Sequence, residues 1–176
     1  MAAPFTKQKL PVMKKFTFTA LLLTAFLFAA NRLQAQDYKT AVGLKFGAYE
    51  NGPSVKYFMN STTALEGILG IRSHGVVITG LYELHQTAFN TPLLKFYYGF
   101  GAHLGSVGKG VYKRFGSDDN VYNDSHILLG ADGVLGLEYK LPDAPFAFSL
   151  DLNPRLELAT GPFFDLAPGL GLKYTF

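Results

Sequence analysis

The sequence predicts an all-β protein, an eight-stranded antiparallel up-and-down transmembrane β-barrel, and three observations support this fold class. Residues 163–176 alternate apolar or aromatic residues with small or charged ones, which gives a strand two chemically different faces. Seven earlier stretches alternate in the same way, and their charged residues avoid the apolar face. The final stretch is long enough for a tilted strand that crosses a hydrocarbon layer, which needs ~9–11 residues.

The first residues are typical of an export signal. Lys14 and Lys15 precede an apolar run over residues 16–30, and residues 33–35 resemble a cleavage site before Gln36. We therefore expect residues 1–35 to be a signal peptide, with Met13 as an alternative true start, and residues 36–176 to form the barrel. An uncleaved anchor helix is the alternative, but the run is shorter than the ~20 residues that a spanning helix needs.

The charge distribution argues against a nucleic-acid partner. The chain has a formal net charge of +3, but five of its 16 basic residues and none of its 13 acidic residues lie in residues 1–35, which leaves −2 for the rest. The chain has no cysteine, so disulfides and a lipid-modified cysteine are excluded. We expect no cofactor.

Turn residues divide the chain into the predicted strands. These strands cover residues 40–49, 54–59, 64–72, 76–85, 94–105, 126–141, 146–158 and 163–176. The first turn is predicted over residues 50–53, where Asn-Gly supplies a positive φ, and residues 90–92 end the fourth segment because proline cannot extend a ladder. Residues 106–125 form the longest loop, which lies outside the cell if the mature amino terminus is periplasmic. Pro154 and Pro168 fall inside strands, where we expect a shared kink or bulge.

The charged strand positions predict an ion network in the interior. Its members are Lys45, Lys56, Glu66, Arg72, Glu83, Lys95, Asp132, Glu138, Lys140, Asp151, Arg155, Glu157, Asp165 and Lys173. An eight-stranded barrel is just wide enough for its own side chains, and unpaired buried ions are costly. We therefore expect the balanced charges to pair and to fill the interior, although a narrow porin-like pore stays an alternative.

The ending is the most specific part of a resemblance that covers residues 36–176. Leu170, Leu172, Tyr174 and Phe176 occupy alternate positions and resemble the C-terminal signal read by the barrel-assembly machinery. The chain is similar to the small bacterial outer-membrane β-barrel proteins of the OmpA/OmpX-like type. The resemblance implies a monomer in the outer membrane of a Gram-negative cell, assembled by that machinery and surrounded by outer-membrane lipid and lipopolysaccharide.

The function predicted from these residues is a structural or interaction role rather than catalysis. A lipid-A-modifying enzyme is one alternative, with Ser125 and His126 near the outer mouth. His103 and His126 flank the longest loop and, as cross-strand neighbours, could join Asp124 in a metal site, although two hydrogen-bonded histidines in a wet mouth are the preferred interpretation. A soluble calycin-like barrel with apolar faces around a greasy ligand is the alternative fold.

Overall fold

The computed structural model describes residues 38–72, 74–112, 119–159 and 163–176, and these residues form β-strands joined by turns. The predicted signal peptide therefore lies outside the described residues. The strands are β1 (Thr40–Gly47), β2 (Asn51–Phe58), β3 (Thr63–Arg72), β4 (Gly75–Ala88), β5 (Thr91–Val107), β6 (Gly110–Tyr112), β7 (Asn120–Tyr122), β8 (His126–Lys140), β9 (Phe146–Glu157) and β10 (Phe163–Thr175). The described part of the chain contains no helix that could span a membrane.

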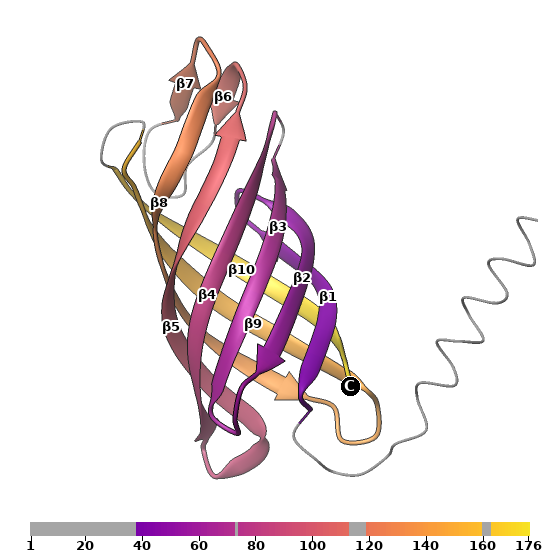
Figure 1. Ribbon diagram of the computed structural model, residues 1–176. Helices are drawn as coiled ribbons and strands as arrows, with labels where there is room; N and C mark the ends of the chain where they lie inside the picture. The colour runs from indigo at the N-terminus through magenta and orange to yellow at the C-terminus, as the bar shows by residue number, and fades with distance from the viewer. Residues whose placement is uncertain (1–37, 73, 113–118, 160–162) are drawn as a thin grey trace, which may run out of the picture. The chain divides into compact units, whose positions relative to one another are not determined.

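Eight of these strands close into one antiparallel barrel. The order around the wall is β1-β10-β9-β8-β5-β4-β3-β2, while β6 and β7 pair with each other in a separate two-stranded sheet (Figure 1). Apart from this hairpin, each strand neighbours the next one along the chain, and pairing of β10 with β1 completes the ring. The predicted eight-stranded up-and-down barrel is confirmed.

The barrel has two different ends. One end, called the terminal end here, holds Tyr38, Phe176 and the turns β2–β3, β4–β5 and β8–β9. The opposite end, the loop end, holds the β1–β2 turn, the end of β3 and the start of β4, the end of β9 and the start of β10, and the paired strands β6 and β7 (Figure 1). Near the terminal end the ring of Tyr174 packs edge-on against Phe146 and Phe176, with centroids 5.5 and 4.8 Å apart.

The barrel wall separates apolar from charged side chains. Ile78, Phe100 and Ile127 point outward and are 62%, 67% and 65% exposed, whereas Lys56 and Lys173 point inward and are 0% and 1% exposed. In the eight barrel strands as described, no Asp, Glu, Lys or Arg occupies an outward position. A calycin-like soluble barrel has the opposite arrangement, so that alternative does not fit this wall.

The first predicted turn is wrong. Residues 48–50 make the turn, closed by hydrogen bonds from Gly47 N to Glu50 O at 3.0 Å and to Asn51 Oδ1 at 3.2 Å. The strand already begins at Asn51, so Pro53 lies inside it. The β2–β3 ladder is interrupted between Asn51 and Ser54, and Pro53 sits in that gap, where its missing N–H costs no hydrogen bond.

The β4–β5 hairpin is longer than predicted. Phe89 and Asn90 have φ values of 50° and 55°, so two left-handed residues form the tight turn, as in type I′ hairpins. A register shift between Thr87 and Ala88 leaves Pro92 and the two residues after it outside the ladder with β4. Proline is compatible with β5 because it occupies this bulge.

The two prolines of the last hairpin do not produce the expected bulge, because β9 and β10 pair in one continuous register. Instead, the β8–β9 ladder is interrupted beside Gly133 and Pro154. The side chain of Asn153 donates from Nδ2 to the Gly133 carbonyl at 3.3 Å. An amide side chain thus replaces the backbone donor that proline lacks.

Inward glycines make room for interior side chains, and Gly136 shows this most directly. A Cβ on Gly136 would lie 2.6 Å from Cζ of Tyr97 and 2.8 Å from Cβ of Asp151, whereas a Cβ on the outward Gly80 would meet nothing within 4 Å. We expect Gly136→Ala to lower the free energy of unfolding by about 1–3 kcal/mol through overpacking.

Gly80→Ala is the matched control, because it makes the same change in open space and should leave stability unchanged within about 0.5 kcal/mol. Urea unfolding of both variants in lipid vesicles, followed by circular dichroism, makes the comparison. Equal stability of the two variants would show that the interior is not tightly packed around Tyr97.

Candidate functional site: the ionic interior

The interior of the barrel is the candidate functional site, and most of the predicted network residues meet there. Eleven of them form ion pairs: Lys45, Lys56, Glu66, Arg72, Glu83, Asp132, Glu138, Asp151, Arg155, Glu157 and Lys173. Lys95 and Asp165 are half-buried and make interactions of their own. Lys140 is half-buried at the last position of β8.

A lysine cluster occupies the interior toward the terminal end and consists of Lys56, Glu66, Glu83, Glu138 and Lys173. Nζ of Lys56 lies 2.8 Å from Glu83, 3.0 Å from Glu138 and 3.2 Å from Glu66. Lys173 approaches the second oxygen of Glu66 at 3.1 Å. Strand alternation places all five side chains inward from five different strands, so the cluster crosses the barrel interior.

Tyr97 connects this cluster with the next pair of charges. The ammonium of Lys56 lies 4.4 Å from the centroid of the Tyr97 ring, a cation–π contact. The Tyr97 hydroxyl donates to Asp151 at 2.7 Å, and Asp151 pairs with Lys45 at 3.0 Å. On the other side, the Tyr97 ring belongs to a buried apolar cluster, whose other members are Ile68, Leu81 and Val134.

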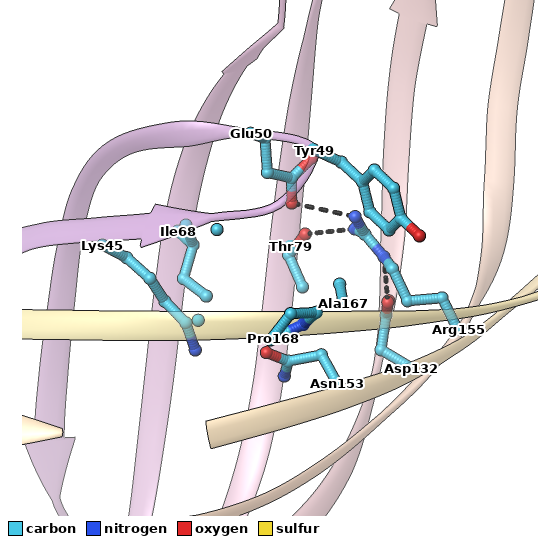
Figure 2. Close-up of a pocket in the computed structure, with 12 residues that line it drawn as sticks. Lys45, Tyr49, Glu50, Ile68, Thr79, Asp132, Asn153, Arg155, Ala167 and Pro168 are labelled. Atoms are coloured by element: carbon cyan, nitrogen blue, oxygen red, sulfur yellow. Dashed lines mark hydrogen bonds and ion pairs between the residues drawn. The ribbon is translucent and has the colours of Figure 1, made fainter. Parts of the chain in front are cut away.

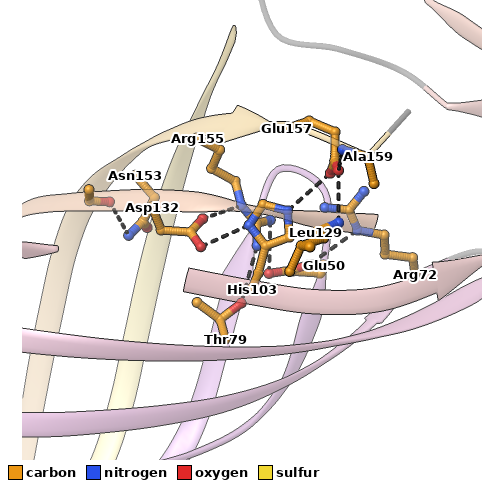
Figure 3. A network of polar contacts seen from close by, with 11 residues as sticks. Glu50, Arg72, Thr79, His103, Leu129, Asp132, Asn153, Arg155, Glu157 and Ala159 are labelled. Atoms are coloured by element: carbon orange, nitrogen blue, oxygen red, sulfur yellow. Dashed lines mark hydrogen bonds and ion pairs between the residues drawn. The ribbon is translucent and has the colours of Figure 1, made fainter. Parts of the chain in front are cut away.

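An arginine cluster lies toward the loop end and consists of Glu50, Arg72, His103, Asp132, Arg155 and Glu157 (Figure 3). Arg155 uses three nitrogens at once. Its Nε contacts Asp132 at 2.7 Å, its Nη1 contacts Glu50 at 3.0 Å, and its Nη2 donates to the Thr79 hydroxyl at 3.1 Å. Glu50 also pairs with Arg72 at 3.1 Å. The planar, forked guanidinium thus binds a different acceptor through each of its three nitrogens, whereas a lysine would offer a single nitrogen.

His103 is held between two carboxylates. Its Nδ1 lies 2.8 Å from Asp132 and its Nε2 lies 3.0 Å from Glu157. A neutral imidazole has one N–H and one lone pair, and a lone pair facing a carboxylate would be repelled. His103 therefore serves as a doubly donating imidazolium, which balances the charges of the arginine cluster at three cations and three anions.

The suggested metal site does not form around His103 and His126. His103 pairs with Gly130, whereas His126 pairs with Val107 farther along β5, so the histidines are not cross-strand neighbours. The His126 ring instead packs against Tyr122, with centroids 4.8 Å apart. Among the described residues, no group of three His, Cys, Asp or Glu side chains could hold a metal ion.

Two network residues were missed because they lie outside the strands. Glu50, in the β1–β2 turn, folds back into the barrel, where the absence of a side chain on Gly70 makes room: a Cβ there would lie 2.7 Å from the Glu50 carboxyl carbon. Tyr38 precedes β1 and donates a short hydrogen bond to Glu138. Burial, together with the Glu138 carboxylate, raises the pKa of Tyr38, so the phenol keeps its proton as the donor. Alternation of residues cannot reveal either position.

A small cavity of about 30 Å³ lies beside the arginine cluster (Figure 2). Charged and amide side chains such as Lys45, Asn153 and Arg155 line it together with apolar groups of Ile68, Ala167 and Pro168. A cavity of this size holds about one or two water molecules. The interior is thus filled by side chains here, with room for local hydration only.

The predicted assembly-signal residues lie on the last strand and at the terminus. Leu170, Leu172 and Phe176 point outward and are 57%, 39% and 54% exposed, while Tyr174 is 9% exposed between neighbouring aromatic rings. Because β10 closes the ring against β1, these side chains flank the seam of the barrel. That the barrel-assembly machinery recognises these residues stays a prediction.

We expect Lys56→Met to lower the free energy of unfolding by about 3–5 kcal/mol, because it leaves three buried carboxyl groups without their shared cation. Lys140→Met is the control, since Lys140 is half-exposed at a strand end and should change stability by at most about 1 kcal/mol. Urea titrations of the two variants in vesicles measure the difference. A Lys56→Met barrel as stable as the control would show that the cluster contributes nothing to folding.

Comparison with known proteins agrees with this architecture. No protein-family model matches the chain, and no curated protein matches it. The solved structure of the N-terminal β-barrel domain of Pseudomonas aeruginosa OprF is similar, with a TM-score of 0.60 and 19% sequence identity over 80% of this chain and 100% of that one. At this identity the likeness shows the fold alone, and it agrees with the eight-stranded β-barrel that the sequence predicts.

Proposed function

We propose that this protein is an integral outer-membrane protein of a Gram-negative bacterium whose filled, non-conducting barrel has a structural or interaction role. The observation that carries the proposal is the sorting of side chains across the wall. Every charged residue of the described barrel strands points inward, and the outward positions are mainly apolar. Hydrocarbon demands this sorting, because a cation at mid-depth on the lipid face costs roughly 2–4 kcal/mol.

The aromatic residues near the terminal end support a membrane position. Tyr174 contacts both Phe146 and Phe176 there, and Tyr139 and Phe148 lie opposite each other on β8 and β9. Aromatic side chains in outer-membrane barrels gather at the level of the lipid head groups. An exterior of this kind fits outer-membrane lipid and lipopolysaccharide, which are the proposed partners. The barrel is proposed to be a monomer.

A continuous channel does not fit the packing of the interior. The two charged clusters flank the buried layer formed by Ile68, Leu81, Tyr97 and Val134. At the loop end, Val77, Val107 and Leu128 form a second buried cluster, against which Tyr112 and Tyr122 of the β6–β7 hairpin pack. Apolar layers that alternate with paired charges leave little space for hydrated ions.

Location is tested by expressing the full chain in a Gram-negative host and separating the membranes by density. We expect a product that lacks residues 1–35, enters the outer-membrane fraction and changes its gel mobility when boiled. Deletion of residues 16–30 is the matched control and should abolish export. Recovery of the intact chain in the inner membrane, or of a soluble product, would contradict the proposal.

We expect no steady conductance from the refolded barrel in a planar bilayer, because its ion pairs and apolar layers occupy the interior. Single-channel recording checks this, with a large porin reconstituted in the same bilayers as the positive control. Stable, frequent opening steps by the unmodified barrel would favour the narrow-pore alternative.

Lipid A from cells with and without the protein should have the same mass; a modified species would favour the enzyme alternative.

A further inference from the structure

The side chain of His103 connects three strands of the barrel wall. His103 lies on β5 opposite Gly130 of β8, and Gly130 in turn lies opposite Glu157, the last residue of β9. Gly130 makes this arrangement possible because it has no side chain: a Cβ there would lie 2.5 Å from Cε1 and 3.0 Å from Nε2 of the imidazole. The ring therefore occupies the space beside the glycine and reaches Glu157 across the intervening strand.

Each acid that faces the imidazole has its other oxygen occupied by donors. Oδ1 of Asp132 accepts from Nε of Arg155 at 2.7 Å. Oε1 of Glu157 accepts from the backbone N–H groups of Leu129 at 2.8 Å and of Ala159 at 3.3 Å. Hydrogen bonds of this kind favour the ionised form of a carboxyl group. The two oxygens that face the ring nitrogens, at 2.8 and 3.0 Å, therefore belong to carboxylates.

Glu157 passes this contact on to the backbone at the loop end. The chain that leaves β9 is held to β8 by hydrogen bonds from Leu158 N and Ala159 N to the Leu129 carbonyl, at 2.9 and 3.3 Å. The Glu157 carboxylate supplements them by accepting from both Leu129 and Ala159. His103 thus fixes the orientation of the side chain that ties the end of β9 to β8.

Loss of one proton from the imidazolium would weaken this arrangement. A neutral imidazole has one N–H group, so it would turn a lone pair toward one of the two carboxylates. Asp132 would keep the charged donor of Arg155, whereas Glu157 would keep only two uncharged backbone donors. Charge-assisted hydrogen bonds are the stronger kind, so Glu157 is the carboxylate that is held less firmly once the proton has left.

We propose that protonated His103 is a clamp that holds the ends of β8 and β9 to β5, and that loss of its proton in alkaline medium releases Glu157 and loosens the loop end. The charged groups around the imidazole, directly or through Arg155, are Asp132 of β8, Glu157 and Arg155 of β9, Glu50 of the β1–β2 turn and Arg72 of β3 (Figure 3). Thr79, which lies opposite His103 on β4, carries no charge. The clamp goes beyond a structural role, because it makes the loop end respond to proton concentration.

Nuclear magnetic resonance of the refolded barrel in detergent, with ¹⁵N-labelled histidine, tests the protonation of the ring. The Cε1–H group of His103 is identified in the unmodified protein by its contact with Gly130. At pH 7.5 a solvent-exposed histidine with the usual pKa of about 6.5 is mostly neutral. We expect hydrogen on both ring nitrogens of His103 at this pH. A His103 ring nitrogen without hydrogen at pH 7.5 overturns the proposal.

Raising the pH tests the clamp itself. When His103 loses one ring hydrogen, the amide signals of Leu129 and Ala159 should shift with the same midpoint, because the Glu157 carboxylate accepts from both. The amide signal of Leu172, which lies on β10 toward the terminal end, should not shift. A proton that stays until the barrel unfolds, or that leaves without moving the two amide signals, shows a fixed ion pair and overturns the proposal.

Glu157→Gln is the most informative variant. The amide keeps an oxygen for the two backbone N–H groups and offers its own N–H to the lone pair of a neutral imidazole. We expect this variant to fold and to lose one His103 ring hydrogen at pH 7.5. Asp143→Asn, which removes an exposed carboxylate from the β8–β9 turn, is the control and should leave both hydrogens in place.

A folded Glu157→Gln barrel in which His103 keeps both ring hydrogens at pH 7.5 overturns the proposal, because Glu157 then does not hold the proton. If this variant does not fold, the titration of the unmodified barrel decides, since its outcome depends on no substitution.

Discussion

The narrow interior of an eight-stranded barrel is the constraint on which this structure depends. Each strand must turn one face inward, and the interior has room for little besides those side chains. A charge placed there needs a protein partner, because the water that could solvate it is largely excluded. Lys56 illustrates the outcome, since its ammonium meets three carboxyl groups and an aromatic ring instead of solvent.

The same constraint sets the positions of the glycines and prolines. Gly136 is required because a methyl group would collide with Tyr97 and Asp151. Pro53 and Pro154 occupy sites where a ladder is already interrupted, and Asn153 supplies the hydrogen bond that Pro154 cannot give. Backbone irregularities in this wall therefore follow from the volume of the side chains and from the supply of hydrogen-bond donors. The β9–β10 register stays continuous through both of its prolines.

The strands and the facing of the charges were predictable from sequence because alternation has a fixed period of two, and a slip of one residue would move every charge to the other face. The turns were less predictable. Asn51-Gly52 resembles a hairpin turn but lies inside β2. The real β4–β5 turn uses Phe89 and Asn90 in a left-handed conformation, which asparagine favours but phenylalanine rarely adopts. Periodicity also cannot locate Glu50 and Tyr38, which enter the network from outside the strands. Nor can it predict which oxygen of each carboxyl group contacts which partner.

Most of the central ion pairs join strands that are not neighbours in the wall. Lys56 on β2 meets Glu138 on β8, Lys173 on β10 meets Glu66 on β3, and Arg155 on β9 reaches back to the β1–β2 turn. Such pairs can form only after the ring has closed, and an open sheet would leave the same charges unpaired beside an apolar surface. These interior charges are costly to bury when they are unpaired. They therefore stabilise the closed barrel relative to partly assembled forms. Closure and charge pairing are therefore expected to occur together, with β10 as the strand that completes both.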